Sequence, residues 1–154
     1  MGEGGAGRKI DHLVMDASVA LKWLLPAEQG EAQAIQILQG LCDKKLTLSA
    51  PTLLIYELLN GLLMAVRRGR ATSDIVLPAS QQFLKLPILY DTSIKSGDST
   101  LALAIRTGLS VYDSAYLELA SRIQRPLVTS DRDLFIKGRK FGCPVIWIED
   151  LRLC

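Results

Sequence analysis

Short apolar runs alternate along the whole chain with longer segments of helical periodicity. The runs predict five β-strands, at residues 12–15, 46–50, 88–90, 127–129 and 145–148. Between them, apolar residues spaced three or four apart predict helices at residues 19–25, 28–42, 51–68, 73–85, 96–107, 113–124 and 131–137. Proline and glycine mark the predicted helix ends at Pro26, Gly69, Gly108 and Pro126.

Strands that alternate with helices are typical of a parallel sheet, because parallel neighbours need a long crossover connection. We therefore expect an α/β fold, with three α/β/α layers around a central, mainly parallel sheet. Ligands of such sheets bind beyond the carboxyl ends of the strands. Asp16 and Asp131 stand at the ends of two predicted strands, and Asp113 stands at a predicted helix start, where the helix dipole favours a carboxylate. The sequence thus predicts these three acids at one edge of the sheet.

Composition limits the possibilities further. A chain of 154 residues with 49% hydrophobic content can bury one sizeable core, so we expect a single domain over residues 10–154 after a flexible, glycine-rich tail at residues 1–9. The net charge is only +2, so nucleic-acid affinity would depend on local clusters of Lys and Arg. Three widely separated cysteines fit a reducing, cytoplasmic setting. No stretch resembles a signal peptide or membrane span, so we expect no membrane contact.

Four acids lie at or beside the ends of apolar segments: Asp16, Glu57, Asp113 and Asp131. A buried carboxylate is costly unless something compensates its charge. If the fold gathers these four, their repulsion requires protons or a cation, and an all-oxygen ligand set suits Mg²⁺ or Mn²⁺. Three of the acids also have a purely structural explanation, Asp16 and Asp113 as helix caps and Glu57 as the partner of an Arg or Lys. Taken together, the four favour a metal-dependent site.

The residues around these acids resemble the PIN domain family, as found in VapC-type toxins of toxin–antitoxin systems. The resemblance rests on the ordered set DASV at 16–19, YELLN at 56–60, YDSAYLELA at 112–120 and TSDRDL at 129–134, and it covers about residues 10–150. It implies an Mg²⁺- or Mn²⁺-dependent endoribonuclease that hydrolyses RNA phosphodiester bonds. It also implies a homodimer and a small antitoxin protein as partners. The sequence does not specify the RNA target.

The resemblance assigns a role to each acid. Asp16, Glu57, Asp113 and Asp131 become catalytic and metal-binding residues, with the three aspartates on a first ion and Glu57 completing that site or holding a second. Asp133 is the alternative to Asp131, which we favour because it is nearer the strand end. Ser114 stands where this family more often has Ala, a mild departure. The supporting residues are Ser18, Asn60, Thr129 and Asp133.

Basic residues are the candidates for substrate contacts. Four follow the TSDRDL motif closely: Arg132, Lys137, Arg139 and Lys140. Arg67, Arg68 and Arg70 contact RNA phosphates or simply balance the dipole at a helix end, and the second role is slightly favoured.

Two other function classes compete with the nuclease. The alternative function is a non-catalytic PIN-like module that binds RNA or a partner protein. An aspartyl-nucleophile phosphatase or transferase is disfavoured, because Asp16 is followed by Ala17 and Ser18 without a second acid.

Overall fold

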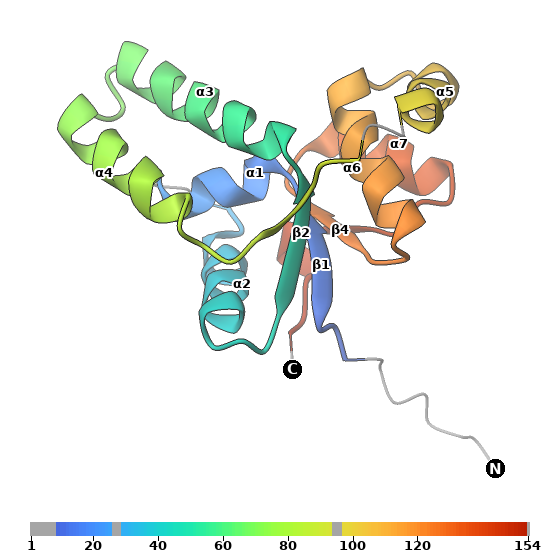
Figure 1. Cartoon of the computed structure of the whole chain (residues 1–154), viewed down its shortest axis with the longest axis horizontal. Coiled ribbons are helices and arrows are strands. Elements are labelled where there is room, and N and C mark those ends of the chain that lie inside the picture. Colours follow the sequence, from blue (N-terminus) through green and yellow to red (C-terminus); the bar gives the residue numbers. More distant parts are fainter. Residues whose placement is uncertain (1–8, 26–28, 94–96, 154) are drawn as a thin grey trace.

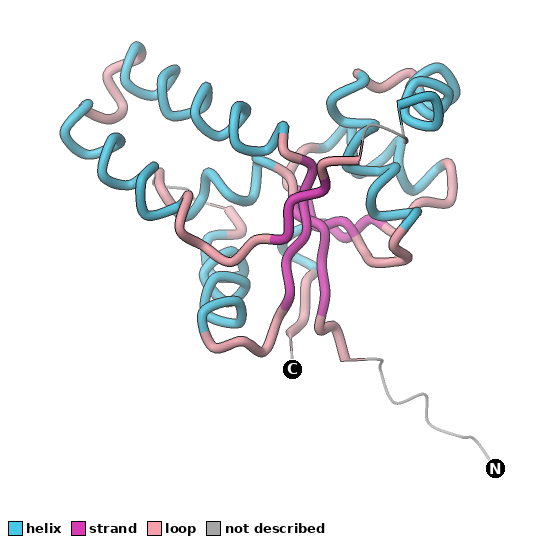
Figure 2. Tube along the Cα trace, viewed as in Figure 1, coloured by secondary structure: helices cyan, strands magenta, loops and turns pink. Residues whose placement is uncertain are grey.

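Five parallel strands form the centre of the protein. The structure is a computed structural model that describes residues 9–25, 29–93 and 97–153. Its strands are β1 (His12–Met15), β2 (Thr47–Pro51), β3 (Leu89–Asp91), β4 (Leu127–Thr129) and β5 (Val145–Trp147). They form one sheet in the order β3-β2-β1-β4-β5, and every neighbouring pair is parallel (Figure 2).

Helices cover the sheet on both sides. On one side lie α1 (Ala17–Ala20), α2 (Glu31–Cys42), α3 (Leu53–Arg67) and α4 (Ser73–Phe83), and on the other lie α5 (Gly97–Thr107), α6 (Val111–Arg122) and α7 (Arg132–Lys140) (Figure 1). Two short 3₁₀ turns, η1 (Leu21–Trp23) and η3 (Ile148–Asp150), complete the described elements. The expected three-layer α/β/α fold is confirmed, and the sheet is wholly parallel.

The central strands explain why the sequence shows unbroken apolar runs. Leu13, Val14 and Met15 of β1 and Leu127 and Val128 of β4 are all completely buried. A parallel strand covered by helices on both faces buries every side chain, so its sequence does not alternate between apolar and polar. Close packing of the layers also depends on a glycine. A Cβ at Gly138 in α7 would lie 2.8 Å from the Val145 side chain of β5 and 2.9 Å from Leu117 of α6.

Several predicted boundaries differ from those observed. The helix expected from residue 51 begins at Leu53, because Pro51 still belongs to β2 and pairs with Asp91 of β3. The helix expected at residues 19–25 is instead α1, which starts at Ala17, followed by the 3₁₀ turn from Leu21. Pro26, the tail at residues 1–8 and the helix starts expected at 28 and 96 lie outside the described residues. The division into a tail and one domain stays a prediction.

Two helix starts carry site residues. The expectation that Asp113 or Ser114 opens α6 was wrong, because the helix begins at Val111 and Ser110 is its N-cap, with Oγ accepting a hydrogen bond from the Asp113 N–H at 3.0 Å. Asp131 is the N-cap of α7, which continues to Lys140, three residues beyond the predicted end. Gly69 and Gly108 adopt the left-handed conformation expected after α3 and α5.

None of the described helices combines the length and apolar character needed to cross a membrane.

Candidate active site

The sequence order of the strands reverses beside β1, and the candidate site lies there. The chain passes from β1 to β2 on one side and returns to β4 on the other, and ligands of parallel sheets bind at the carboxyl ends of strands at such a reversal. Asp16 follows β1 and caps α1, whereas Thr129 ends β4 and Asp131 follows it. The register, with Met15 opposite Val128, brings Asp16 next to Thr129.

Asp16 is buried, with 5% of its surface exposed, and its carboxylate is held by hydroxyl groups. Ser18 Oγ donates to Oδ1 at 2.6 Å, and Thr129 Oγ1 donates to Oδ2 at 2.6 Å. The Val19 N–H also donates to Oδ1, at 3.3 Å. Both carboxylate oxygens therefore have neutral donors, and each retains acceptor capacity for another ligand.

The two hydroxyl groups also fix the start of α7. Ser18 Oγ accepts from the Ser130 N–H at 2.9 Å, and Thr129 Oγ1 accepts from the Asp131 N–H at 2.9 Å. Asp131 Oδ1 in turn accepts from the Leu134 N–H at 2.8 Å. Each hydroxyl thus links the Asp16 carboxylate to the backbone that follows β4, so that the chain segments after β1 and β4 are held in register.

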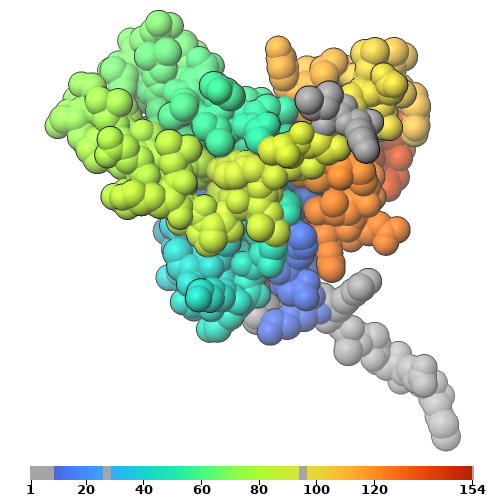
Figure 3. Space-filling model, viewed as in Figure 1, coloured from blue at the N-terminus to red at the C-terminus, as the bar shows by residue number. Residues whose placement is uncertain are grey.

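Glu57 and Asp113 reach the same region from opposite layers. Figure 3 shows a notch at the top of the molecule between α3, in green, and α5 and α6, in yellow to orange. Glu57 lies on α3, and its Oε2 accepts a 2.5 Å hydrogen bond from the phenol of Tyr116 on α6. Asp113, in the first turn of α6, accepts from Ser110 Oγ through Oδ2 at 2.7 Å. Tyr116, only 1% exposed, bridges the two helices.

The acids influence one another electrostatically. Burial raises the pKa of Asp16 to about 6; the negative charge of Asp131 adds to this rise, and the bonds from Ser18, Thr129 and Val19 oppose it. Burial also raises the pKa of Glu57, and the Asp113 carboxylate raises it further. The pKa of Tyr116 is raised by burial first, then by its bond to Glu57 and by the charges of Glu57, Asp16 and Asp113. All four predicted acids therefore contribute to one region of negative potential.

The ligand set suits a hard divalent cation. Among the described residues, no Lys or Arg forms an ion pair with any of the four acids. The side-chain atoms available as metal ligands are all oxygens, which Mg²⁺ and Mn²⁺ prefer. Within the described ranges, no group of three or more His, Cys, Asp or Glu side chains lies close enough together to hold a metal ion as it stands. Glu57 and Asp113 instead engage Tyr116 and Ser110, hydroxyl partners with which a cation would compete.

The other site residues predicted from the sequence lie in different environments. Asp133 is exposed and forms an ion pair with Lys137 at 3.3 Å, so Asp131, and not Asp133, lies with Asp16. Asn60 is exposed, three residues after Glu57 on α3. The basic residues of α7 are largely engaged locally. Lys137 also donates to the Gly108 carbonyl at 3.4 Å, Arg139 lies over the Phe135 ring and Lys140 over Phe141, whereas Arg132 is exposed at the helix start.

Tyr116 is the residue that sequence reasoning missed. It follows Asp113 by three positions on α6, so the two side chains share a face of the helix. It was assigned no role from the sequence, and its neighbours Leu117 and Leu119 are apolar. The available signal was its hydroxyl group, because a buried phenol needs a hydrogen-bond partner.

Comparisons with known proteins agree with this geometry. Residues 13–140 match the PIN domain family, and the chain belongs to that family. Within it, the chain is related to the VapC-type ribonucleases. Ribonuclease VapC3 of Pyrobaculum aerophilum is 33% identical over 125 residues, which cover 79% of this chain and 91% of the relative.

Solved structures support the fold. The crystal structure of PAE2754 from Pyrobaculum aerophilum is 25% identical, with a TM-score of 0.65 over 97% of this chain and 93% of that one. The structure of VapC20 from Mycobacterium tuberculosis, a sarcin-ricin loop cleaving toxin, has a TM-score of 0.62 over 85% of this chain and 95% of its own. At 11% identity, VapC20 shows a shared fold alone.

The raised pKa of Asp16 predicts how Asp16→Asn changes stability. The folded protein binds this proton more tightly than the unfolded chain, so wild-type stability falls as the pH rises from the ordinary value of 3.8 through about 6, and it stays lower above that. Removing the charge should stabilise the metal-free fold at neutral pH by up to about 3 kcal/mol, with little gain near pH 4. Urea unfolding in EDTA at both pH values measures this.

Asp133→Asn is the matched control, because Asp133 is exposed in an ion pair. Its effect should be small at both pH values. An equal effect of Asp16→Asn at acidic and neutral pH would contradict the prediction.

Tyr116→Phe tests the phenol that holds Glu57. The ring and its packing are retained, but Glu57 loses a bond that lowers its pKa, so that pKa should rise further. If Glu57 serves a metal-dependent reaction, we expect a roughly 10- to 100-fold loss of activity and an acidic limb of the pH–rate profile displaced to higher pH. Tyr90→Phe is the control, because its buried hydroxyl has no hydrogen-bond partner in the described structure. An unchanged rate and pH profile in Tyr116→Phe would refute the role.

Proposed function

We propose that this protein is a metal-dependent endoribonuclease that hydrolyses RNA phosphodiester bonds and acts as the toxin of a toxin–antitoxin pair. The observation that carries the proposal is the buried Asp16 carboxylate, held by two hydroxyl groups beside Asp131 and without a basic partner among the described residues. A site that collects negative charge in this way binds a cation before it binds an anionic substrate. The relationship to Ribonuclease VapC3 supports the choice of RNA.

The residues of the candidate site have different roles in the proposed reaction. A bound Mg²⁺ or Mn²⁺ supplies neutralisation of the phosphate charge and activation of the attacking water. Asp16, Asp113 and Asp131 would hold it, and the Ser18 and Thr129 hydroxyls keep Asp16 in one orientation. Tyr116 donates to Oε2 of Glu57, so Oε1 would be the oxygen that Glu57 offers to a cation.

The expected products follow from hydrolysis by water. Attack in line with the departing 3′ oxygen leaves 5′-phosphate and 3′-hydroxyl ends. The 2′-hydroxyl takes no part in this step, so a preference for RNA over DNA has to come from binding contacts.

Cleavage of a labelled single-stranded RNA and of a structured tRNA pool tests the function. We expect cutting with Mg²⁺ or Mn²⁺, none with EDTA, and 5′-phosphate ends. Asp16→Asn and Asp113→Asn should lower the rate at least about a hundredfold, since each removes a charge that the reaction needs. Asp133→Asn, which changes the same charge on an exposed residue, should cleave like the wild type.

Two results would contradict the nuclease function. Activity that survives both substitutions would point to a contaminant or a different site. Absence of cleavage over a broad RNA panel, together with absence of metal binding by calorimetry, would favour the non-catalytic module that binds RNA or a partner protein.

We propose two protein partners, a second copy of the chain and a small antitoxin. Large apolar side chains are exposed on the helices around the site, with Tyr56 76% exposed on α3, Ile105 75% on α5 and Tyr112 66% on α6. Such surface is commonly covered in an assembly. Light scattering should give the mass of a dimer for the protein alone and a larger mass after co-expression with a small reading frame adjacent to its gene. A stable monomer in both samples would reject both partners.

A further inference from the structure

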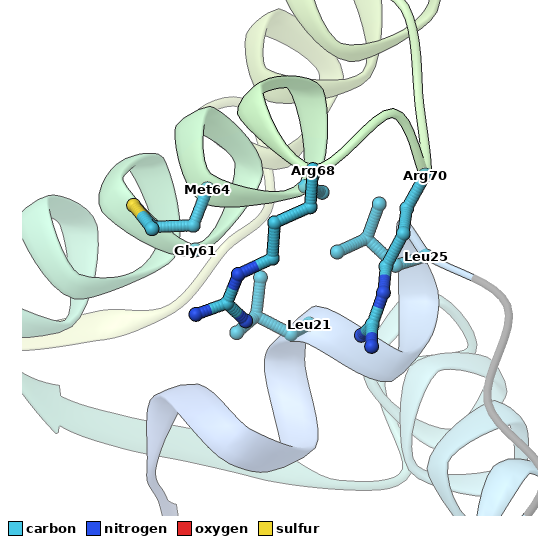
Figure 4. Close-up of a pocket in the computed structure, with 7 residues that line it drawn as sticks. Leu21, Leu25, Gly61, Met64, Arg68 and Arg70 are labelled. Carbon is cyan, nitrogen blue, oxygen red and sulfur yellow. The ribbon is translucent and has the colours of Figure 1, made fainter.

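A hollow of about 750 Å³ lies between η1 and the second half of α3, apart from the four acids. Seven residues line it: Leu21, Leu25, Gly61, Met64, Ala65, Arg68 and Arg70. Figure 4 shows the guanidinium groups of Arg68 and Arg70 extending from the end of α3 toward the segment that carries Leu21 and Leu25. The hollow therefore combines an aliphatic floor with two cationic groups.

Both walls of this hollow begin at the candidate active site. One wall follows Asp16, because Asp16 caps α1 and η1 continues directly from α1 to Leu21. The other wall is one face of α3, on which Glu57, Gly61, Met64 and Arg68 recur at intervals of three or four residues. Glu57 and Arg68 are eleven residues apart, which corresponds to about 16 Å along a helix.

Gly61 sets the depth of the floor. A Cβ at this position would lie 2.7 Å from Leu21 Cδ1, closer than side chains tolerate, so the missing side chain allows η1 to approach α3. Gly61 and Leu21 both line the hollow, and Gly61 lies between Glu57 and Arg68 along α3.

The two arginines are available for an anion. Within the described ranges, neither Arg68 nor Arg70 forms an ion pair or lies over an aromatic ring. Lys137 and Arg139 of α7 differ in this respect, since Lys137 pairs with Asp133 and Arg139 covers Phe135. A guanidinium group presents a planar fork of donors that matches the oxygens of a phosphate.

We propose that this hollow anchors the phosphate backbone of the substrate RNA, about five stacked nucleotides from the bond that is cut. This rests on the proposed nuclease function. RNA fits better than an acidic protein segment for a reason of charge. An RNA strand carries a phosphate at every nucleotide, so one strand can present one anion to the cation at the acids and another to Arg68 and Arg70, about 16 Å away. A protein segment would need acidic residues at both places.

The anchor fixes the position of the strand without selecting its sequence. Phosphate contacts orient a nucleic acid, and base edges specify it. Apart from the two arginines, the lining side chains are aliphatic or absent and offer no hydrogen bonds to bases. The contribution of this hollow to RNA affinity should therefore depend on the length of the RNA and not on its sequence.

Binding of single-stranded RNAs of increasing length to the Asp16→Asn protein tests the anchor. In this background cleavage should be at least about a hundredfold slower, and Mg²⁺ is kept in every sample so that the remaining acids can meet the RNA with a cation. Affinity should rise once the strand is long enough to reach from the acids to Arg68 and Arg70. The double substitution Arg68→Glu/Arg70→Glu should remove this rise, weaken binding of long RNAs at least about tenfold, and lower the salt slope by roughly 1.4.

Arg67→Glu is the control for one charge reversal, and Arg68→Glu alone is the variant that changes the net charge by the same amount. Arg67 is exposed in the last turn of the same helix but does not line the hollow, so Arg67→Glu changes the net charge without changing the anchor. The length-dependent rise should persist in Arg67→Glu. Circular dichroism and thermal melting of every variant verify that each remains folded.

Two outcomes separate the anchor from the function on which it rests. If the wild type cleaves RNA but Arg68→Glu loses no more affinity than Arg67→Glu, the anchor is rejected and the nuclease stands. In that case the hollow is left for an acidic segment of a partner protein. If the wild type cleaves no RNA with either metal, the nuclease function itself fails.

Discussion

Burial of one carboxylate, with no basic partner in the described part of the chain, is the constraint on which this structure depends. Asp16 keeps its place because two hydroxyl groups and a backbone N–H bind its oxygens. Those donors come from both sides of the strand reversal, Ser18 from the turn after β1 and Thr129 from the end of β4. The parallel pairing of these two strands is thus what makes the buried charge tolerable, and the charge in turn favours this register over a shifted one. The contact between Asp16 and Thr129 therefore supports both the pairing of β1 with β4 and the geometry of the candidate site.

The other acids show how two layers of helices share one site. α3 and α6 approach from opposite sides of the sheet, and Tyr116 joins them through Glu57. The phenol and Ser110 hold Glu57 and Asp113 where the Asp113 charge raises the pKa of Glu57, as the charge of Asp131 raises that of Asp16. Proteins commonly place such repulsion where they bind ligands, because the ligand relieves it on binding.

The central strands could be predicted from sequence because burial on both faces leaves uninterrupted apolar runs; the bounds of β1 and β4 were predicted without error. Ser110 was harder to recognise, since Ser and Asp both cap helices well and three candidates lay within five residues. The bond from Tyr116 to Glu57 joins residues 59 positions apart, and periodicity carries no information about such pairs. The same limit applies to Arg68, whose neighbours on η1 come from a distant part of the chain, so that a role at the helix end looked sufficient.

The contact between Gly61 and Leu21 has a consequence for how this chain can evolve. A glycine in mid-helix weakens α3 relative to alanine by roughly 1 kcal/mol, a cost that selection would ordinarily remove. Yet a single nucleotide change to an alanine codon would place a methyl group 2.7 Å from Leu21 Cδ1, so the Leu21 side chain would have to move. The residue at position 61 therefore controls how closely the Leu21 side chain can pack against α3 in this hollow. A change there alters none of the four acids. Homologues with a different residue at this position would be expected to differ in the ligand that the hollow binds, while keeping the same acids at the candidate active site.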